Sequence, residues 1–402
     1  MKKLFPFLVF LFFLSEELLA KPEYAVRIRA NRCTTCHSSP AGGGHRNLTG
    51  KAFGPKSAPL KSFSEQDIFG FDLRAIAYTP LKNVDKQANG LGVMAAIPSV
   101  SIPFHSNDKG LEWRLVYSQN IGGFGGFTTP RDAYLRVKLY DDYRAFPQFI
   151  TIGRFSPPFG LMTDEHRTYV RQQTKTSWNE QEMGILLSGD WSYKFHYDIA
   201  IVNGEQTKGQ GFGEGLIYEW GAIANIRYLA NWGWMAGVSG SAHHCVPVRE
   251  EGKKCAAAAS LYQVLSLDSL TNSWLPGALL AEAVAGYNTN SHLQGTKFVS
   301  NLNYLTSVLE DKYSVGARVQ WNYNFFPDWT FVVKYDYLTL DWEYRKDAYY
   351  RVGAGLNHFF NNQTSLQVRY EKAFATPADE VNAEKKGFAG QDIIWLLLQV
   401  KI

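Results

Sequence analysis

The chain has 402 residues, with 41 Lys and Arg against 37 Asp and Glu, so its charge is nearly balanced. This balance excludes the strongly basic surface that is typical of nucleic-acid-binding proteins, and we expect no nucleic-acid partner. After residue 20, no apolar run reaches the roughly 20 residues that a membrane-spanning helix needs, which excludes a helical membrane protein.

Residues 1–20 have the pattern of a secretory signal peptide. Lys2 and Lys3 precede an apolar run from Leu4 to Leu14, and Ala20 is a small residue at the expected cleavage site. The run is too short to cross a bilayer as an anchor. We therefore expect export of the mature chain, which places its cysteines in an oxidising compartment.

The segment 21–65 carries a motif for covalent haem. Cys33, Cys36 and His37 form a C-x-x-C-H sequence, in which two thiols bond to the haem vinyl groups and the histidine becomes the proximal iron ligand. A thioredoxin-like redox pair would need a βαβ context, and a zinc site that used His45 would lack a second close pair of thiols. The motif predicts one haem c, held in a short segment that is mostly helical or irregular.

The distal side of this iron has several candidate ligands. His45 lies in the same segment and would complete a bis-histidine site, whereas Met162 or Met94 would give a His/Met site with a higher potential. A five-coordinate iron is the fourth alternative. The segment is too small to bury a haem alone, so we expect residues 66–402 to supply the remaining shelter at or in the periplasmic mouth of a barrel.

Residues 66–402 show the alternation of half-buried β-strands. In the stretch from Trp329 to Tyr337, every second residue is apolar, and polar residues such as Lys334 and Asp336 fall between them. A soluble β-sandwich would also alternate, but segments of about ten residues with aromatic ends favour an antiparallel transmembrane β-barrel.

We predict about 16 strands, the even number that bacterial barrels have. Long connections then alternate with short ones, provided that 297–309, which has helical apolar spacing, is a helix in a loop. Pro98 and Pro103 fit this prediction poorly, because proline has no backbone N–H group to donate to the neighbouring strand of the second predicted strand. The candidate strands are 68–79, 91–104, 110–120, 132–142, 148–156, 183–190, 192–203, 216–228, 232–242, 257–268, 277–288, 313–323, 328–340, 347–359, 363–374 and 391–402.

Two of the long connections carry further candidate features. The connection 157–182 begins Pro157-Pro158-Phe159 and continues into a charged cluster, so it either folds into the lumen as a constriction or lies in solvent as an outer loop. In the connection 243–256, we expect Cys245 and Cys255 to form a disulfide that closes an outer loop, with a metal site as the weaker alternative.

This layout resembles the monohaem outer-membrane cytochrome–porin fusions, which have a signal peptide, one C-x-x-C-H near the mature N-terminus and a porin-like barrel. The likeness covers the whole chain in architecture, but only Cys33, Cys36 and His37 match at the level of a motif. The stretch from Gly153 to Leu161 also looks like a segment of anion-selective porins. The resemblance to the fusions implies electron transfer at the outer membrane of a Gram-negative bacterium, with haem on the periplasmic or lumen side.

The partners that this resemblance implies are a periplasmic electron carrier, an extracellular electron donor or acceptor such as ferrous iron, and outer-membrane lipid. Such a protein transfers electrons and is not a classical enzyme. The alternative is a diffusion or anion-type porin whose haem is structural or sensory. A haem enzyme such as a peroxidase is disfavoured, because no catalytic set surrounds the single motif.

Overall fold

The structure is a computed structural model of the chain. It describes Ala25, Cys36, His37 and residues 68–401, with gaps at 82–88, 107–110, 124–129, 141–145, 164–167, 175, 177–180, 204–219, 248–252, 272–273, 288, 290–312, 327, 340–341, 343–347, 361–362 and 376–391. The predicted helix at 297–309 lies outside the described residues, as do Cys33 and His45.

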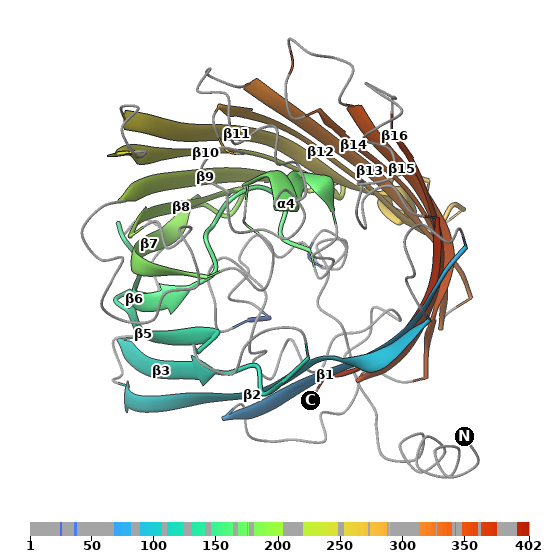
Figure 1. The fold of residues 1–402 in the computed structure, drawn as a ribbon. Helices are drawn as coiled ribbons and strands as arrows, with labels where there is room; N and C mark the ends of the chain where they lie inside the picture. Colours follow the sequence, from blue (N-terminus) through green and yellow to red (C-terminus); the bar gives the residue numbers. More distant parts are fainter. Residues whose placement is uncertain are drawn as a thin grey trace.

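The described residues form a single antiparallel sheet that closes on itself (Figure 1). Apart from one strand of two residues, each strand pairs with its neighbours in sequence, and the first strand pairs with both the second and the last. The strands are β1 (Phe69–Pro80), β2 (Gly90–Ser106), β3 (Glu112–Ser118), β4 (Gly122–Gly123), β5 (Asp132–Lys138), β6 (Phe149–Phe155), β7 (Glu182–Ser192), β8 (Phe195–Val202), β9 (Gly221–Ala230), β10 (Trp234–Pro247), β11 (Lys253–Ser266), β12 (Gly277–Tyr287), β13 (Tyr313–Phe326), β14 (Trp329–Thr339), β15 (Ala348–Phe359), β16 (Thr364–Ala375) and β17 (Ile393–Lys401).

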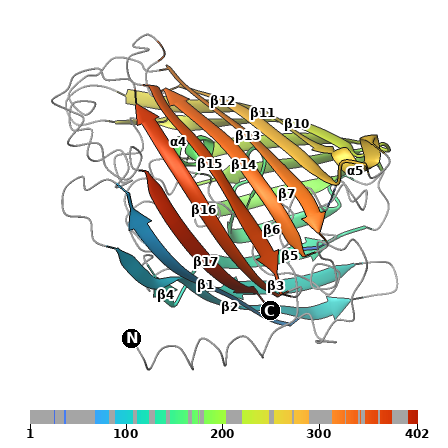
Figure 2. The ribbon, with the colours of Figure 1, turned by 90° about the vertical axis from the view of Figure 1, so that its right-hand side faces the viewer.

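The barrel has 16 strands, because the two-residue β4 continues β3 along the same neighbour. Both pair with β2, and Ile121 between them still donates to the Ala96 carbonyl. The predicted antiparallel barrel and its strand number are therefore confirmed, whereas the predicted haem-binding segment lies almost wholly outside the described residues. Figure 2 shows the strands inclined to the axis of the barrel, as closure of a sheet requires.

The alternation predicted from the sequence separates an apolar outer face from a charged inner face. On β14, Trp329 and Tyr335 are exposed on the outside, whereas Lys334 and Asp336 are buried on the inside. Charged side chains are almost never fully buried unless they are paired, and here they pair across the inner wall. Apolar side chains thus face outward and charged side chains face the interior of the barrel, the reverse of the arrangement in a soluble protein.

The two prolines of the second strand are accommodated where its ladder is interrupted. Pro98 lies opposite the break between β3 and β4, and its carbonyl accepts from the Gln119 amide. Pro103 precedes a bulge and lies beyond the end of β1, so it has a strand partner only on the β3 side. A missing N–H is tolerated at such bulges and edges.

The hairpin of β10 and β11 is longer than predicted. Both strands continue past a bulge between His243 and Val246, which shortens the predicted connection 243–256 to 248–252. The described residues also include the short helices α4 (Tyr169–Thr174) and α5 (Leu267–Leu270). Among the described residues, no helix is long and apolar enough to cross a membrane.

Candidate functional site: a loop bound to the inner wall

The connection between β6 and β7 folds into the barrel and carries α4, which lies inside the ring of strands (Figure 1). Its first residues, Pro157 and Pro158, lack amide donors and cannot extend β6 as a paired strand. Phe159 and Leu161 are buried, and α4 packs against β12, β13 and β14. The described part of this connection therefore lies in the lumen, and the charged residues 164–167 are outside the described residues.

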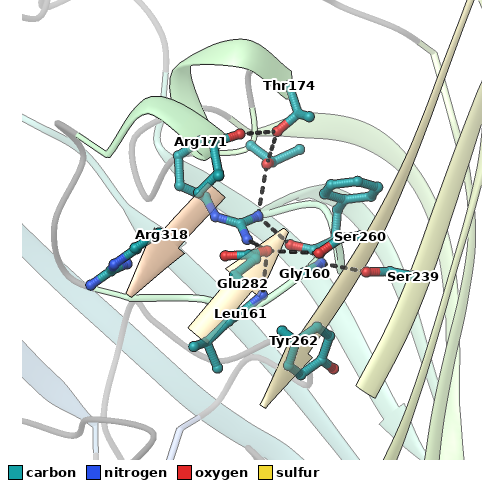
Figure 3. A network of polar contacts seen from close by, with 12 residues as sticks. Gly160, Leu161, Arg171, Thr174, Ser239, Ser260, Tyr262, Glu282 and Arg318 are labelled. Carbon is teal, nitrogen blue, oxygen red and sulfur yellow. Dashed lines mark hydrogen bonds and ion pairs between the residues drawn. The ribbon is translucent and has the colours of Figure 1, made fainter. Parts of the chain in front are cut away.

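A buried ion pair joins this loop to the wall (Figure 3). The Arg171 guanidinium on α4 donates to Glu282 Oε1 on β12, and both side chains are at most 1% exposed. The same oxygen accepts from Ser260 Oγ at 2.8 Å and from the Leu161 amide at 3.0 Å. Because buried charges are costly unless they are paired and hydrogen-bonded, this convergence fixes the loop at one place.

Arg171 also holds the loop to itself. Its Nη1 donates to the Phe159 carbonyl at 2.6 Å and to Thr176 Oγ1 at 3.0 Å. Gly160 makes the turn between these groups with a φ of 63°, and a Cβ at this position would overlap the Glu282 carboxylate and the Arg171 guanidinium. Only glycine combines this left-handed conformation with such close packing.

Further polar contacts reach the neighbouring strands. The Gly160 amide donates to Ser239 Oγ on β10 at 2.7 Å, and Gln173 Nε2 donates to Ser314 Oγ on β13 at 2.7 Å. The Arg351 guanidinium on β15 lies 4.5 Å from the centre of the Tyr169 ring. The loop is thus attached to a continuous arc of the inner wall.

Apolar packing supports these contacts. Phe159 and Val170 of the loop join a buried cluster with inner-wall residues, and burial of a side chain of this size contributes about 1.5–3 kcal/mol. The inner-wall members of the cluster are Val116, Tyr134, Phe155, Leu186, Ala200, Val202, Ile223, Ala258 and Val284. A loop that covers this patch removes it from the water of the lumen.

Arg318 on β13 contacts the loop at a second place, and its side chain lies apart from the Glu282 network (Figure 3). Its Nη1 donates to Thr163 Oγ1 of the loop at 2.9 Å, and its Nη2 donates to Gln320. Within the described residues, no carboxylate lies within ion-pair distance of Arg318. Its charge therefore adds to the field in the lumen.

Most other charges on the inner wall are paired. Lys334 Nζ lies 2.6 Å from Glu371 Oε1, and Arg351 Nη2 lies 2.8 Å from Asp336 Oδ2. On the opposite wall, the His196 ring nitrogens lie 2.7 Å from Asp190 and 3.1 Å from Asp198. No group of three or more His, Cys, Asp or Glu side chains in the described part of the chain could hold a metal ion.

The predicted haem motif is only partly within the described residues. His37 is 7% exposed and forms a β-bridge, and the half-buried Cys36 carries a thiol and not a disulfide. Met162 is half-buried on the lumenal loop, and Met94 is half-buried on β2. The haem and its distal ligand stay predictions.

The predicted disulfide falls within the β10–β11 hairpin. Cys255 is disulfide-bonded, and the register places Cys245 in the bulge opposite this position. The bond between these two residues stays a prediction.

Sequence reasoning did not identify Glu282, Arg318 or Ser239. The available signal was Glu282 itself, which is the only charged residue in the otherwise apolar strand Gly277–Tyr287. An acidic residue on the polar face of an apolar strand indicates a partner inside the barrel. The partner could not be chosen, because Arg171 lies 111 residues earlier in the chain.

Solved structures of bacterial porins share this fold. The chain is similar to the OmpF porin of Salmonella typhi in complex with daunomycin, with a TM-score of 0.58 and 11% identity over 83% of this chain and 97% of that chain. It is also similar to the outer-membrane channel DcaP of Acinetobacter baumannii (TM-score 0.57, 11% identity, 83% and 96% covered). The anion-selective porin of Comamonas acidovorans gives a TM-score of 0.57 at 11% identity, with 83% and 98% covered. No family model matches the chain, and no curated protein matches it in sequence.

Proposed function

We propose that this protein is a diffusion channel in the outer membrane of a Gram-negative bacterium, and that residues 156–176, which we call the constriction loop, narrow its lumen. The observation that carries the proposal is the loop bound to the inner wall by Arg171 and Glu282. A loop fixed in this way narrows the lumen. It would set the size of the solutes that pass.

The outer face supports the membrane location. Leu91, Ile201 and Leu261 are each more than 60% exposed on the outside of the barrel. Contiguous exposed apolar surface marks a membrane or protein contact. Aromatic pairs such as Trp232–Trp234 and Phe325–Trp329 lie beside the short turns, as in the interfacial girdle of a membrane barrel.

Conductance in planar lipid bilayers tests this function. Purified wild-type protein should give stepwise single-channel currents, and replacement of residues 157–181 by a short turn should raise the step size, because the constriction is gone. Unboiled samples of both proteins should keep the gel shift of a folded barrel. A folded wild type that carries no ion current would exclude the diffusion channel.

A second function, electron transfer through one haem c, is favoured by the burial of His37 next to the thiol of Cys36. A c-type proximal histidine must be sheltered, so this environment fits the group that the C-x-x-C-H motif predicts. The haem, when bound, would supply one-electron redox chemistry. Cys33 and Cys36 would attach it, and His37 would hold the iron. Its partners would be a periplasmic carrier and an extracellular donor or acceptor such as ferrous iron.

Haem staining and liposome assays separate these two functions. Denatured wild-type protein should keep haem at its own mass, and Cys33→Ser with Cys36→Ser should remove it. In liposomes with a sealed oxidant, wild type should carry electrons inward from an external reductant, and His37→Ala should not, although its barrel folds. Equal transfer by wild type and His37→Ala would reject the haem as the conduit.

A further inference from the structure

Two arginines lie directly opposite each other on the inner wall. Arg114 on β3 pairs in register with Arg136 on β5, and both side chains are buried on the inner face of the sheet. In an antiparallel pair, residues in this position have Cβ atoms about 4.5–5.5 Å apart, and two like charges there are destabilising. An anion between the two guanidiniums would offset this repulsion.

The Glu112 carboxylate is such an anion. Its Oε1 accepts from Arg114 Nε at 2.8 Å and from Arg136 Nη2 at 3.2 Å. The Glu112 side chain is 27% exposed, against 11% and 9% for the side chains of Arg114 and Arg136. The carboxylate therefore lies on the accessible side of the arginine pair. The pair already binds a carboxylate, one that belongs to the chain itself.

Neighbouring strands hold the two guanidiniums independently of Glu112. Arg114 Nη1 donates to Ser101 Oγ on β2 at 3.1 Å, and Ser101 is fully buried. The Arg136 guanidinium lies 5.7 Å from the centre of the Phe149 ring on β6. Donors that are already ordered lose little conformational freedom when they bind a ligand. The pair is thus preorganised for a carboxylate, whether that group belongs to Glu112 or to a solute.

The arginine pair lies next to the constriction. Val116 on β3 pairs with Tyr134 on β5, and both belong to the buried cluster that includes Phe159 of the constriction loop. Arg114 and Arg136 are the next inward residues of the two strands, towards the short turn between β2 and β3. Short turns face the periplasm in bacterial barrels. A solute that has passed the constriction from outside therefore meets the arginine pair next.

We propose that Arg114 and Arg136 form a binding step for solutes that carry a carboxylate, and that Glu112 competes with the solute for this step. The inference rests on the diffusion channel proposed above and names a class of solute for it. A guanidinium matches a planar carboxylate with charge-assisted hydrogen bonds. A solute carboxylate would accept from the same donors that now bind Glu112.

Exchange of Glu112 for a solute leaves the released carboxylate near another cation. Lys138 lies directly opposite Glu112 on β5, two positions from Arg136 on the same face. Oppositely charged residues in this arrangement attract each other. Competition also keeps solute binding weak, and a channel conducts only when its sites release the solute as well as bind it. Glu112 thus adjusts the arginine pair for passage of the solute.

Block of the single-channel current by succinate tests this step. Succinate should reduce the current of the wild-type channel weakly. Glu112→Gln keeps the shape of the side chain but removes the competing charge, so the apparent affinity for succinate should rise about tenfold. If Glu112 serves only to offset the repulsion between the two arginines, Glu112→Gln should instead give a less stable barrel and no gain in affinity. That result would overturn the proposal.

Arginine-to-lysine variants separate binding from the general electric field of the lumen. In the Glu112→Gln background, Arg136→Lys keeps the charge but loses the planar guanidinium, so the affinity for succinate should fall about tenfold. Arg227→Lys is the matched control, because Arg227 is an inner-wall arginine on β9 that lies 3.4 Å from Asp198, and it should leave the affinity unchanged.

Two further outcomes are decisive. Equal affinities with and without Arg136→Lys would show that charge alone acts, and would overturn the arginine site. Stepwise currents that succinate leaves unchanged in every variant would refute the binding step alone, whereas a folded wild type without any current would refute the channel itself.

Discussion

Single residues decide where the constriction loop lies. Glu282 Oε1 receives three donors, from α4, from β11 and from the loop backbone, within one water-poor site. A carboxylate held in this way is costly to leave without its cation, because the remaining charge would be buried and unpaired. The position of the loop therefore depends on the pair and not on either residue alone.

We expect Glu282→Gln to loosen the loop. Loss of one partner of a buried pair costs about 3–5 kcal/mol, whereas its replacement by two apolar residues is often neutral. Glu282→Gln should raise channel conductance and expose residues 157–181 to protease, with the barrel still folded. The double variant Arg171→Met with Glu282→Leu should restore both properties towards wild type. A Glu282→Gln protein with normal conductance would mean that the apolar cluster alone holds the loop.

Gly160 sets the turn at the start of the same loop. Ala at this position would strain the left-handed backbone and overlap the Arg171–Glu282 pair. Gly160→Ala should therefore mimic Glu282→Gln in conductance and proteolysis. Gly240→Ala on β10 is the control, because the nearest atom to its new Cβ is the Ala258 carbonyl oxygen at 3.9 Å. Wild-type behaviour of Gly160→Ala would contradict this role of the turn.

At the scale of the element, strands could be predicted because each carries its own signal. On β14 the alternation from Trp329 to Thr339 separates the outer and inner faces, whatever the neighbouring strands are. The course of the constriction loop carries no such signal. Its hydrogen bonds to the wall join residues 79 to 155 positions apart, as with Gly160 and Ser239 or Thr163 and Arg318. Such pairs exist only once the barrel has closed.

The two faces of β16 should respond differently to the same charge. Val368 is outward and 41% exposed, whereas Gln367 faces inward beside Asn357 and Leu397. Val368→Arg should destabilise the barrel by about 2–4 kcal/mol if the site is at the bilayer midplane, and Gln367→Arg should cost less because the lumen is polar. Reversible urea unfolding in lipid vesicles measures both. An equal loss of the free energy of unfolding in the two variants would contradict the assignment of the outer and inner faces of β16.

At the scale of the whole molecule, the enclosed charges do not cancel. Among the described residues, the buried charged side chains comprise eleven Lys and Arg and nine Asp and Glu. Arg318 contributes to this excess at the edge of the constriction loop. A cationic constriction raises the local concentration of anions and should make the channel weakly anion-selective.

Arg318→Gln tests this field while it keeps a donor for Thr163. A unit positive charge 10 Å away in water attracts chloride and repels potassium by about 0.4 kcal/mol each, so it changes their relative permeability by roughly fourfold. In bilayers under a salt gradient, the reversal potential should show a preference for chloride over potassium that falls by about fourfold in Arg318→Gln. Lys372→Gln removes a charge from the exposed face of β16 and should leave the preference unchanged. A cation-selective wild type, or equal shifts in the two variants, would show that the paired charges and not Arg318 govern which ions enter.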